Sequence, residues 1–296
     1  MQTERKVRTC ELGKIMTLIS IVLGLALVSF LGPRDRFRDY SWFDRYSNWL
    51  EMRCNSYSFW DGPAGVVLTP ALPLALLLIL AGWLGEISAL FPWLIAMVVF
   101  VYSLGADPSR YFNSLLAIVA DNDEAGLKDL VRELGLDPEQ IDNSRIVRAL
   151  LLQAHAHLFG VIFWFIILGM TGALLYALTG VMHQRYRDIH GGYSRAVADL
   201  RSILMWPSAR LLALGFALSG SLEDALNGWR SVQGATLECS EEIIAASGLG
   251  AMQFRPEQDE EQNFSNQIYA LQAMINRTLI IWLTVLGLMT IANWLS

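Results

Sequence analysis

The residues best suited to bind a ligand lie in one short cluster, Arg185-Tyr-Arg-Asp188, which is followed by His190-Gly-Gly192. An arginine side chain carries a planar fork of N–H donors that matches the shape of phosphate and carboxylate groups. We therefore consider Arg185, Tyr186, Arg187 and Asp188 as candidate residues of an anion-binding site. Basic residues beside an aromatic one flank ordinary membrane segments so commonly that a topology signal is the simpler interpretation of the cluster.

Two histidines, His155 and His157, lie just before a long apolar stretch. Side chains two residues apart on an α-helix point about 200° away from each other, so this pair cannot easily hold one metal ion. We expect the histidines either to anchor the start of the apolar stretch at a membrane interface or to contribute to ligand binding. The sequence predicts no metal site.

A third candidate is Trp206-Pro-Ser-Ala-Arg210, in which one arginine interrupts an apolar segment. A charge in such a segment has to pair with a carboxylate or reach water. Asp188, Asp199 and Glu223 are candidate partners. A structural role and a ligand-binding role for Trp206 and Arg210 both stay open.

The composition indicates a membrane protein. Of the 296 residues, 54% are hydrophobic and 17% are charged, whereas about 25% are charged in soluble proteins. The net charge of −6 and the lack of a basic stripe exclude a nucleic-acid partner. The three cysteines are too far apart for a zinc site or a disulfide framework. The common metalloprotease, P-loop and dinucleotide-binding motifs are absent, so the sequence requires no cofactor.

Four apolar segments are predicted to span the membrane, because a hydrocarbon core of about 30 Å needs roughly 20 apolar residues. They cover residues 16–31, 64–84, 87–104 and 278–294. The second and third are separated only by Gly85 and Glu86, which predicts a tight helical hairpin. The first is preceded by a basic stretch, and no small-residue cleavage site follows its apolar run, which favours an uncleaved anchor.

Two further segments are ambiguous. Residues 159–182 are long enough to span once, but Gly169-Met-Thr-Gly172 at their centre would suit a turn and make a re-entrant hairpin. Residues 203–219 carry Arg210 and are predicted to be interfacial or buried against protein. A re-entrant hairpin places 18 of the 22 basic residues on one side of the membrane, whereas a single span divides them 12 to 10. Because basic loops favour the cytoplasm, we expect the hairpin.

The polar parts of the chain are predicted to be helical, because no alternating strand pattern occurs. Residues 109–120, 122–134 and 145–158 are expected to form three helices, with Gly135 ending the second and Asp142 capping the third. The overall prediction is an all-α, polytopic membrane protein with about four spanning helices, a re-entrant hairpin and cytoplasmic helices. Its predicted regions are an N-terminal extension (1–15), three membrane segments with loop 32–63 (16–104), a cytoplasmic helical region (105–158), the hairpin or span (159–182), a second cytoplasmic region with interfacial helix 203–219 (183–277) and a C-terminal membrane helix (278–296).

Residues 145–229, and less clearly most of the chain, resemble the AmpE family, which is related to the membrane proteins of cobalamin biosynthesis called CobD or CbiB. The resemblance rests on an ordered set of short stretches rather than on any single one. These are Arg148-Ala-Leu-Leu-Leu-Gln-Ala-His-Ala-His-Leu-Phe-Gly160, Phe163-Trp-Phe165, Gly169-Met-Thr-Gly-Ala-Leu-Leu-Tyr176, Arg185-Tyr-Arg187, Trp206-Pro-Ser-Ala-Arg210 and Gly228-Trp229.

One departure separates this chain from the cobinamide synthases. The family likeness leads us to expect Ala-Glu-Asn-Thr-x-Asp-Gly before the hairpin, but this chain has Ala154-His-Ala-His-Leu-Phe-Gly160. The two carboxylates and the carboxamide that could hold Mg²⁺–phosphate or move protons are therefore missing.

The resemblance implies a multi-pass protein of the bacterial inner membrane with a role in β-lactamase induction and cell-wall stress. We expect it to be a non-enzymatic regulator that lies in the lipid bilayer and binds an anionic small molecule or a partner membrane protein at its cytoplasmic face. The alternative is a CobD/CbiB-like enzyme that forms an amide bond with ATP.

Overall fold

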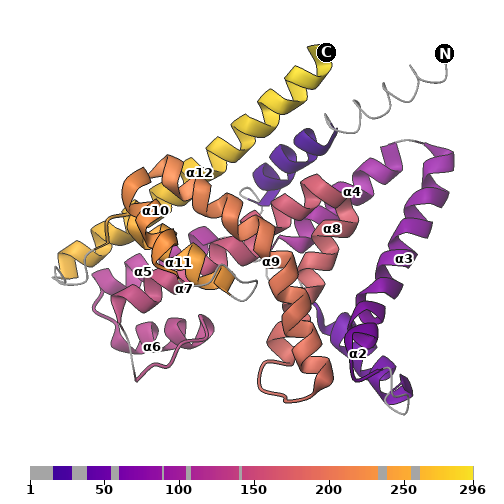
Figure 1. The fold of residues 1–296 in the computed structure, drawn as a ribbon, viewed down its shortest axis with the longest axis horizontal. Coiled ribbons are helices and arrows are strands. Elements are labelled where there is room, and N and C mark those ends of the chain that lie inside the picture. The colour runs from indigo at the N-terminus through magenta and orange to yellow at the C-terminus, as the bar shows by residue number, and fades with distance from the viewer. Residues whose placement is uncertain are drawn as a thin grey trace. The chain divides into compact units, whose positions relative to one another are not determined.

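The computed structural model describes residues 16–28, 39–54, 60–88, 90–104, 108–139, 142–232, 239–254 and 261–295. Every regular element in these ranges is a helix (Figure 1), which confirms the predicted all-α class. The predicted N-terminal extension, residues 1–15, lies outside the described residues. The chain forms two compact units, which are described separately below.

Unit 1 comprises residues 1–105, 160–205 and 287–296. It contains a helix over Met16–Val28, then α2 (Ser41–Cys54), α3 (Pro63–Ile87), α4 (Leu90–Ser103), α8 (Gly160–Arg185) and the first part of α9 (Gly192–Ser219). Its hydrophobic core combines residues from α2, the start of α3, the second half of α8 and the start of α9. The core is built on Phe43, Leu50, Trp60, Val66, Leu174, Leu178, Met182, Tyr186, Tyr193, Ala196 and Val197.

Four helices are long and apolar enough to cross a membrane, by length and composition. They cover Pro63–Ile87, Asn143–Arg185, Gly192–Ser219 and Phe264–Ala292, while Met16–Val28 and Leu90–Ser103 are shorter apolar helices. The number of candidate spans, four, agrees with the prediction. Of these four, only Pro63–Ile87 and Phe264–Ala292 correspond to predicted spans.

Several predicted boundaries were wrong. The helix α3 continues through Gly85 and Glu86 and ends only at Ile87, where Ser88 adopts an extended conformation. The helix α9 begins at Gly192, eleven residues before the predicted interfacial segment 203–219. One of its first free N–H groups, the Tyr193 amide, donates a hydrogen bond of 2.7 Å to the carboxylate of Asp61. This cap comes from a distant part of the chain, so the local sequence does not reveal where α9 starts.

The helix α8 reverses direction at Gly169, which has a φ of +65° and a ψ of −150° inside an otherwise helical stretch. A side chain at Gly160 would overlap the ring of Tyr176, and one at Gly172 would overlap the carbonyl oxygen of Trp164. Residues 160 and 176 would be about 24 Å apart in a single straight helix. The predicted turn therefore exists, and α8 is a helical hairpin. Its re-entry into the bilayer stays a prediction.

Unit 2 comprises residues 106–159 and 206–286. It contains α5 (Pro108–Ala120), α6 (Glu124–Glu133), α7 (Asn143–Ala154), the π-helical turn η2 (His155–Phe159), the second part of α9, α10 (Leu222–Ser231), α11 (Ser240–Ala251) and most of α12 (Glu261–Leu295). The helices α10 and α11 pack so closely that a side chain at Gly228 would overlap the carbonyl oxygen of Ala246.

The local signals for α6 and α7 were mostly correct. Gly135 follows α6 with a φ of +76°, and its amide bonds back to Arg132. Asp142 caps α7 by accepting a hydrogen bond from the Ser144 amide. The start of α6 was predicted two residues too early, because Asn122 takes a left-handed conformation (φ +50°) and Asp123 is the cap.

We predict that Gly169→Ala destabilises the protein by about 1–3 kcal/mol, because the combination of a φ of +65° with a ψ of −150° is essentially restricted to glycine. The space around Gly169 is open, so no steric clash contributes. Gly82→Ala is the matched control, since this glycine also has nothing within 4 Å but lies inside α3. It should be neutral or slightly stabilising. Thermal unfolding in detergent measures both; an equal response of the two variants would contradict the strained reversal.

Candidate functional site

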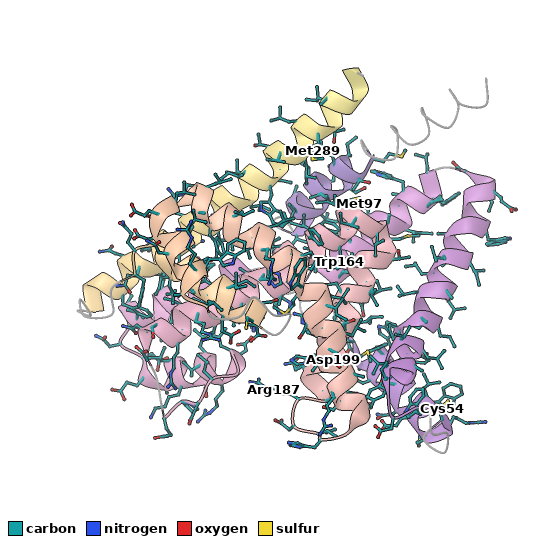
Figure 2. The ribbon with its side chains drawn as sticks, viewed as in Figure 1. Cys54, Met97, Trp164, Arg187, Asp199 and Met289 are labelled. Carbon is teal, nitrogen blue, oxygen red and sulfur yellow. The ribbon has the colours of Figure 1, made fainter. Side chains whose placement is uncertain are left out.

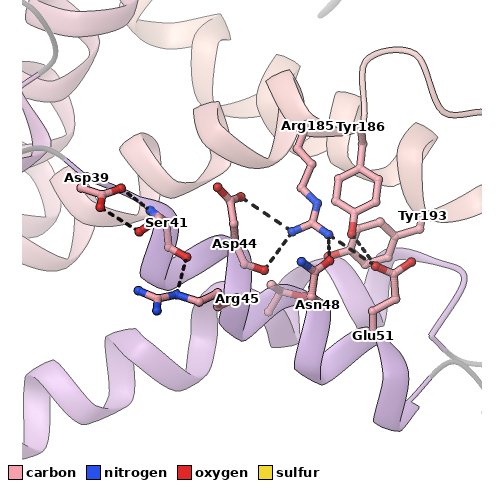
Figure 3. A network of polar contacts seen from close by, with 10 residues as sticks. Asp39, Ser41, Asp44, Arg45, Asn48, Glu51, Arg185, Tyr186 and Tyr193 are labelled. Carbon is pink, nitrogen blue, oxygen red and sulfur yellow. Dashed lines mark hydrogen bonds and ion pairs between the residues drawn. The ribbon is translucent and has the colours of Figure 1, made fainter.

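Arg185, at the end of α8, is held by three polar residues of α2 (Figure 3). Its guanidinium donates hydrogen bonds to the Asp44 carbonyl oxygen, at 3.1 Å, and to the Asn48 side-chain oxygen. It also lies 3.7 Å from an Asp44 carboxylate oxygen and 3.8 Å from one of Glu51. The Arg185 side chain is 24% exposed, so these contacts are only partly screened by water. We call Arg185, Asp44, Asn48 and Glu51 the arginine clasp.

The clasp follows from the helical period of α2. Asp44, Asn48 and Glu51 are spaced by four and three residues and therefore share one helix face. Phe43 and Leu50, seven residues apart, are buried in the core of unit 1. The same helix thus supplies an apolar row to the core and a polar row to Arg185.

Two tyrosines extend the clasp toward α3 and α9. The Tyr186 hydroxyl donates a 3.0 Å hydrogen bond to Glu51, and its ring lies 4.9 Å from that of Tyr193. The Tyr193 hydroxyl is 2.8 Å from the hydroxyl of Thr69 in α3. Burial raises the pKa of Tyr186 well above its ordinary value, and the Arg185 charge only partly opposes this effect. The phenol is therefore a neutral hydrogen-bond donor at physiological pH.

Arg187 and Asp188 lie beyond the clasp, in the connection between α8 and α9 (Figure 2), and both are exposed. Among the described residues, no ion pair involves Arg187. The two arginines of the predicted anion site thus differ. Arg185 already faces carboxylates, whereas Arg187 presents its charge to solvent.

His155 and His157 lie in unit 2 and behave differently from each other. His155 is completely buried, and its Nε2 atom is 2.9 Å from the hydroxyl of Ser208, which is also completely buried. His157 is partly buried. Both belong to the π-helical turn η2, a local widening of the helix that is frequent at functional sites.

Trp206 and Arg210 form a local pair on α9, also in unit 2. The Arg210 guanidinium lies 4.3 Å from the centre of the Trp206 ring and donates a 3.0 Å hydrogen bond to the Trp206 carbonyl oxygen. The expectation that Arg210 pairs with a carboxylate or reaches water stays a prediction.

The eight predicted site residues are thus divided between the units. Unit 1 contains Arg185, Tyr186, Arg187 and Asp188, and unit 2 contains His155, His157, Trp206 and Arg210. Sequence reasoning missed the residues that contact them: Asp44, Asn48 and Glu51 around Arg185, and Ser208 beside His155. The polar row of α2 is visible in the sequence, but nothing local assigns it to a residue about 140 positions away.

The family profile described as "Regulatory signalling modulator protein AmpE" matches residues 16–295. The chain belongs to the AmpE family. This result confirms the resemblance that the sequence suggested, and together with the long apolar helices it identifies a membrane protein.

Two curated relatives of the chain carry the name of a cobalamin biosynthesis protein. This AmpE chain is similar to the "Cobalamin biosynthesis protein CobD" of Stutzerimonas stutzeri, with 27% identity over 256 residues, which is 79% of this chain and 80% of the relative. A protein of the same name from Chromobacterium violaceum is 28% identical over 125 residues, or 39% of each chain. No solved structure matches the chain.

We predict that Arg185→Gln lowers the free energy of unfolding by about 2 kcal/mol, because it removes the hydrogen bonds that the charged guanidinium donates and takes the cation away from the carboxylates of Asp44 and Glu51. Arg187→Gln is the matched control, and it should change stability by no more than about 0.5 kcal/mol, as is usual for exposed positions. Unfolding of both purified variants in the same detergent tests this. Equal stability of the two variants would show that the clasp contributes nothing.

Proposed function

We propose that this AmpE-family chain is a non-enzymatic regulator of the bacterial inner membrane that modulates β-lactamase induction in response to cell-wall stress. The observation that carries the proposal is the match of nearly the whole chain, residues 16–295, to a family of signalling modulators. The proposed mode of action is binding: an anionic ligand or a partner membrane protein would change the state of the chain.

The environment of residues 154–160 supports binding rather than amide-bond synthesis. Where the family likeness to the synthases leads us to expect carboxylates, this chain has His155 and Phe159, and both are completely buried. His155 contacts Ser208, and the Phe159 ring packs edge-on against Trp282 at 5.3 Å. These two positions are filled by packed side chains, which leaves no group there to hold Mg²⁺–phosphate.

The difference between Arg185 and Arg187 supports a ligand-binding role for Arg187. The carboxylates of the clasp largely neutralise Arg185 and fix the end of α8 against α2. Arg187 follows two residues later with an exposed guanidinium. In this proposal Arg185 is a positioning residue, and Arg187 makes the contact with the anion.

Deletion of the gene in a host with inducible β-lactamase should abolish or strongly reduce induction by a β-lactam. Complementation with the Arg187→Ala variant should restore induction less well than the unchanged chain, because the anion contact is lost. Arg230→Ala is the control, since Arg230 is also an exposed arginine. β-Lactamase activity before and after induction is the readout, and unchanged inducibility in the deletion strain would overturn the proposal.

The similarity to CobD over most of both chains favours a second candidate, a cobinamide-synthase-like enzyme. We predict that this chain does not rescue growth of a strain that lacks its corrinoid synthase under corrinoid-dependent conditions. The reason is that the carboxylates expected for the chemistry are replaced at residues 155 and 159. The Stutzerimonas stutzeri protein is the positive control, and rescue by this chain at a comparable expression level would establish the enzyme instead.

A further inference from the structure

The helix α2 has an exposed face whose composition is unusual for a surface in contact with water. Trp42, Trp49 and Met52 are 39%, 50% and 77% exposed. Met52 lies opposite the buried Phe43 and Leu50, whereas Trp42 and Trp49 lie to one side of them, where the Trp42 ring packs edge-on against Phe43 at 5.6 Å. Large apolar side chains that gather on one helix face commonly mark a surface that contacts a membrane or another protein.

Two arginines, Arg45 and Arg53, lie on the same face and are exposed. The Arg53 guanidinium lies 5.7 Å from the centre of the Trp49 ring, so the aromatic and basic groups are interleaved. The acidic residues of α2, Asp44 and Glu51, instead contact Arg185. The acidic group close to this face is Asp39, just before the helix, whose pKa is lowered by hydrogen bonds from Ser41 and slightly by Arg45.

The position of α2 within unit 1 indicates what this face meets. At its start, the Tyr40 hydroxyl donates a hydrogen bond to the carbonyl oxygen of Tyr102, near the end of α4. The clasp joins α2 to the end of α8, and the core joins it to the starts of α3 and α9. Two helices therefore end, and two begin, beside α2. The ends of membrane helices lie at the headgroup region of the bilayer.

We propose that α2 lies in the plane of the membrane surface and binds anionic phospholipids, with Trp42, Trp49 and Met52 in the interfacial region and Arg45 and Arg53 on the headgroup phosphates. Tryptophan is enriched at this depth, and arginine is attracted to anionic headgroups. An amphipathic helix with one such face is the usual form of an in-plane membrane anchor. The arginine clasp, on another side of the helix, would hold the anchor against the membrane helices.

The depth of α2 can be measured on the full-length chain in vesicles of phosphatidylcholine and phosphatidylglycerol. Cys10, Cys54 and Cys239 are replaced by serine, and a spin label is attached to Met52→Cys. Two reference labels are used for comparison. One is attached to Lys128→Cys, on the exposed surface of α6, and the other to Leu76→Cys, on the exposed apolar face of α3. We expect a water-soluble paramagnetic reagent to reach label 52 much less than label 128, and oxygen to reach it less than label 76. Accessibility of label 52 equal to that of label 128 would overturn the proposal and favour a water-facing partner surface.

The role of charge is tested by combining Arg45→Gln with Arg53→Gln. The unfolding temperature of the unchanged chain should rise when phosphatidylglycerol replaces part of the phosphatidylcholine, and the double variant should lose most of this rise. Each arginine near the membrane favours the anionic surface by about fivefold. The control variant is Arg230→Gln, on α10. If the effect of anionic lipid is specific to α2, this variant keeps the rise in unfolding temperature. An undiminished rise in the double variant would overturn the assignment of anionic lipid to these two arginines.

Discussion

The reversal of α8 at Gly169 is the backbone constraint on which the rest of unit 1 depends. It requires a positive φ, a conformation that glycine adopts at little cost and other residues adopt rarely. Because the chain turns back there, Tyr176 lies against Gly160, and the second half of α8 can join the core that α2, α3 and α9 share. The end of α8 then meets α2, which brings Arg185 to Asp44 and Glu51. A single straight helix would place Tyr176 about 24 Å from Gly160 instead of against it, and the same contacts could not form.

The arginine clasp changes how the basic cluster after α8 can be interpreted. A cluster of arginines beside a membrane helix attracts anions less strongly when nearby carboxylates already balance its positive charge. Here the balance differs within two residues, because Arg185 has two carboxylates within 4 Å and Arg187 is exposed. The acidic row of α2 consequently does two things: it fixes the helix against the membrane bundle, and it leaves Arg45 and Arg53 as the charges on the exposed face.

Local signals predicted local features, and the failures came where distant residues decide. Gly135 and Asp142 were identified from their neighbours alone, because the bonds that end α6 and cap α7 span only a few residues. The turn at Gly169 was visible as a pair of glycines inside an apolar stretch. The start of α9 was missed because its cap, Asp61, lies over 130 residues earlier in the chain. The same reason explains why residue types suggested Arg185 as a ligand-binding residue, while its partners on α2 could not be found.

The likeness to CobD is most informative at residues 154–160, where the resemblance leads us to expect carboxylates that this chain lacks. A shared scaffold with 27% identity can keep its helices while one short stretch loses its chemistry, since fold and function are carried by different residues. In this chain the stretch before the α8 hairpin widens into a π-helical turn, and its side chains at 155 and 159 pack against Ser208 and Trp282. To restore carboxylates there would bury negative charge among apolar neighbours, at a cost of several kcal/mol unless a cation were bound as well. The packing around residues 155 and 159 therefore fits the side chains that are present, and it would have to change to accommodate carboxylates at these two positions.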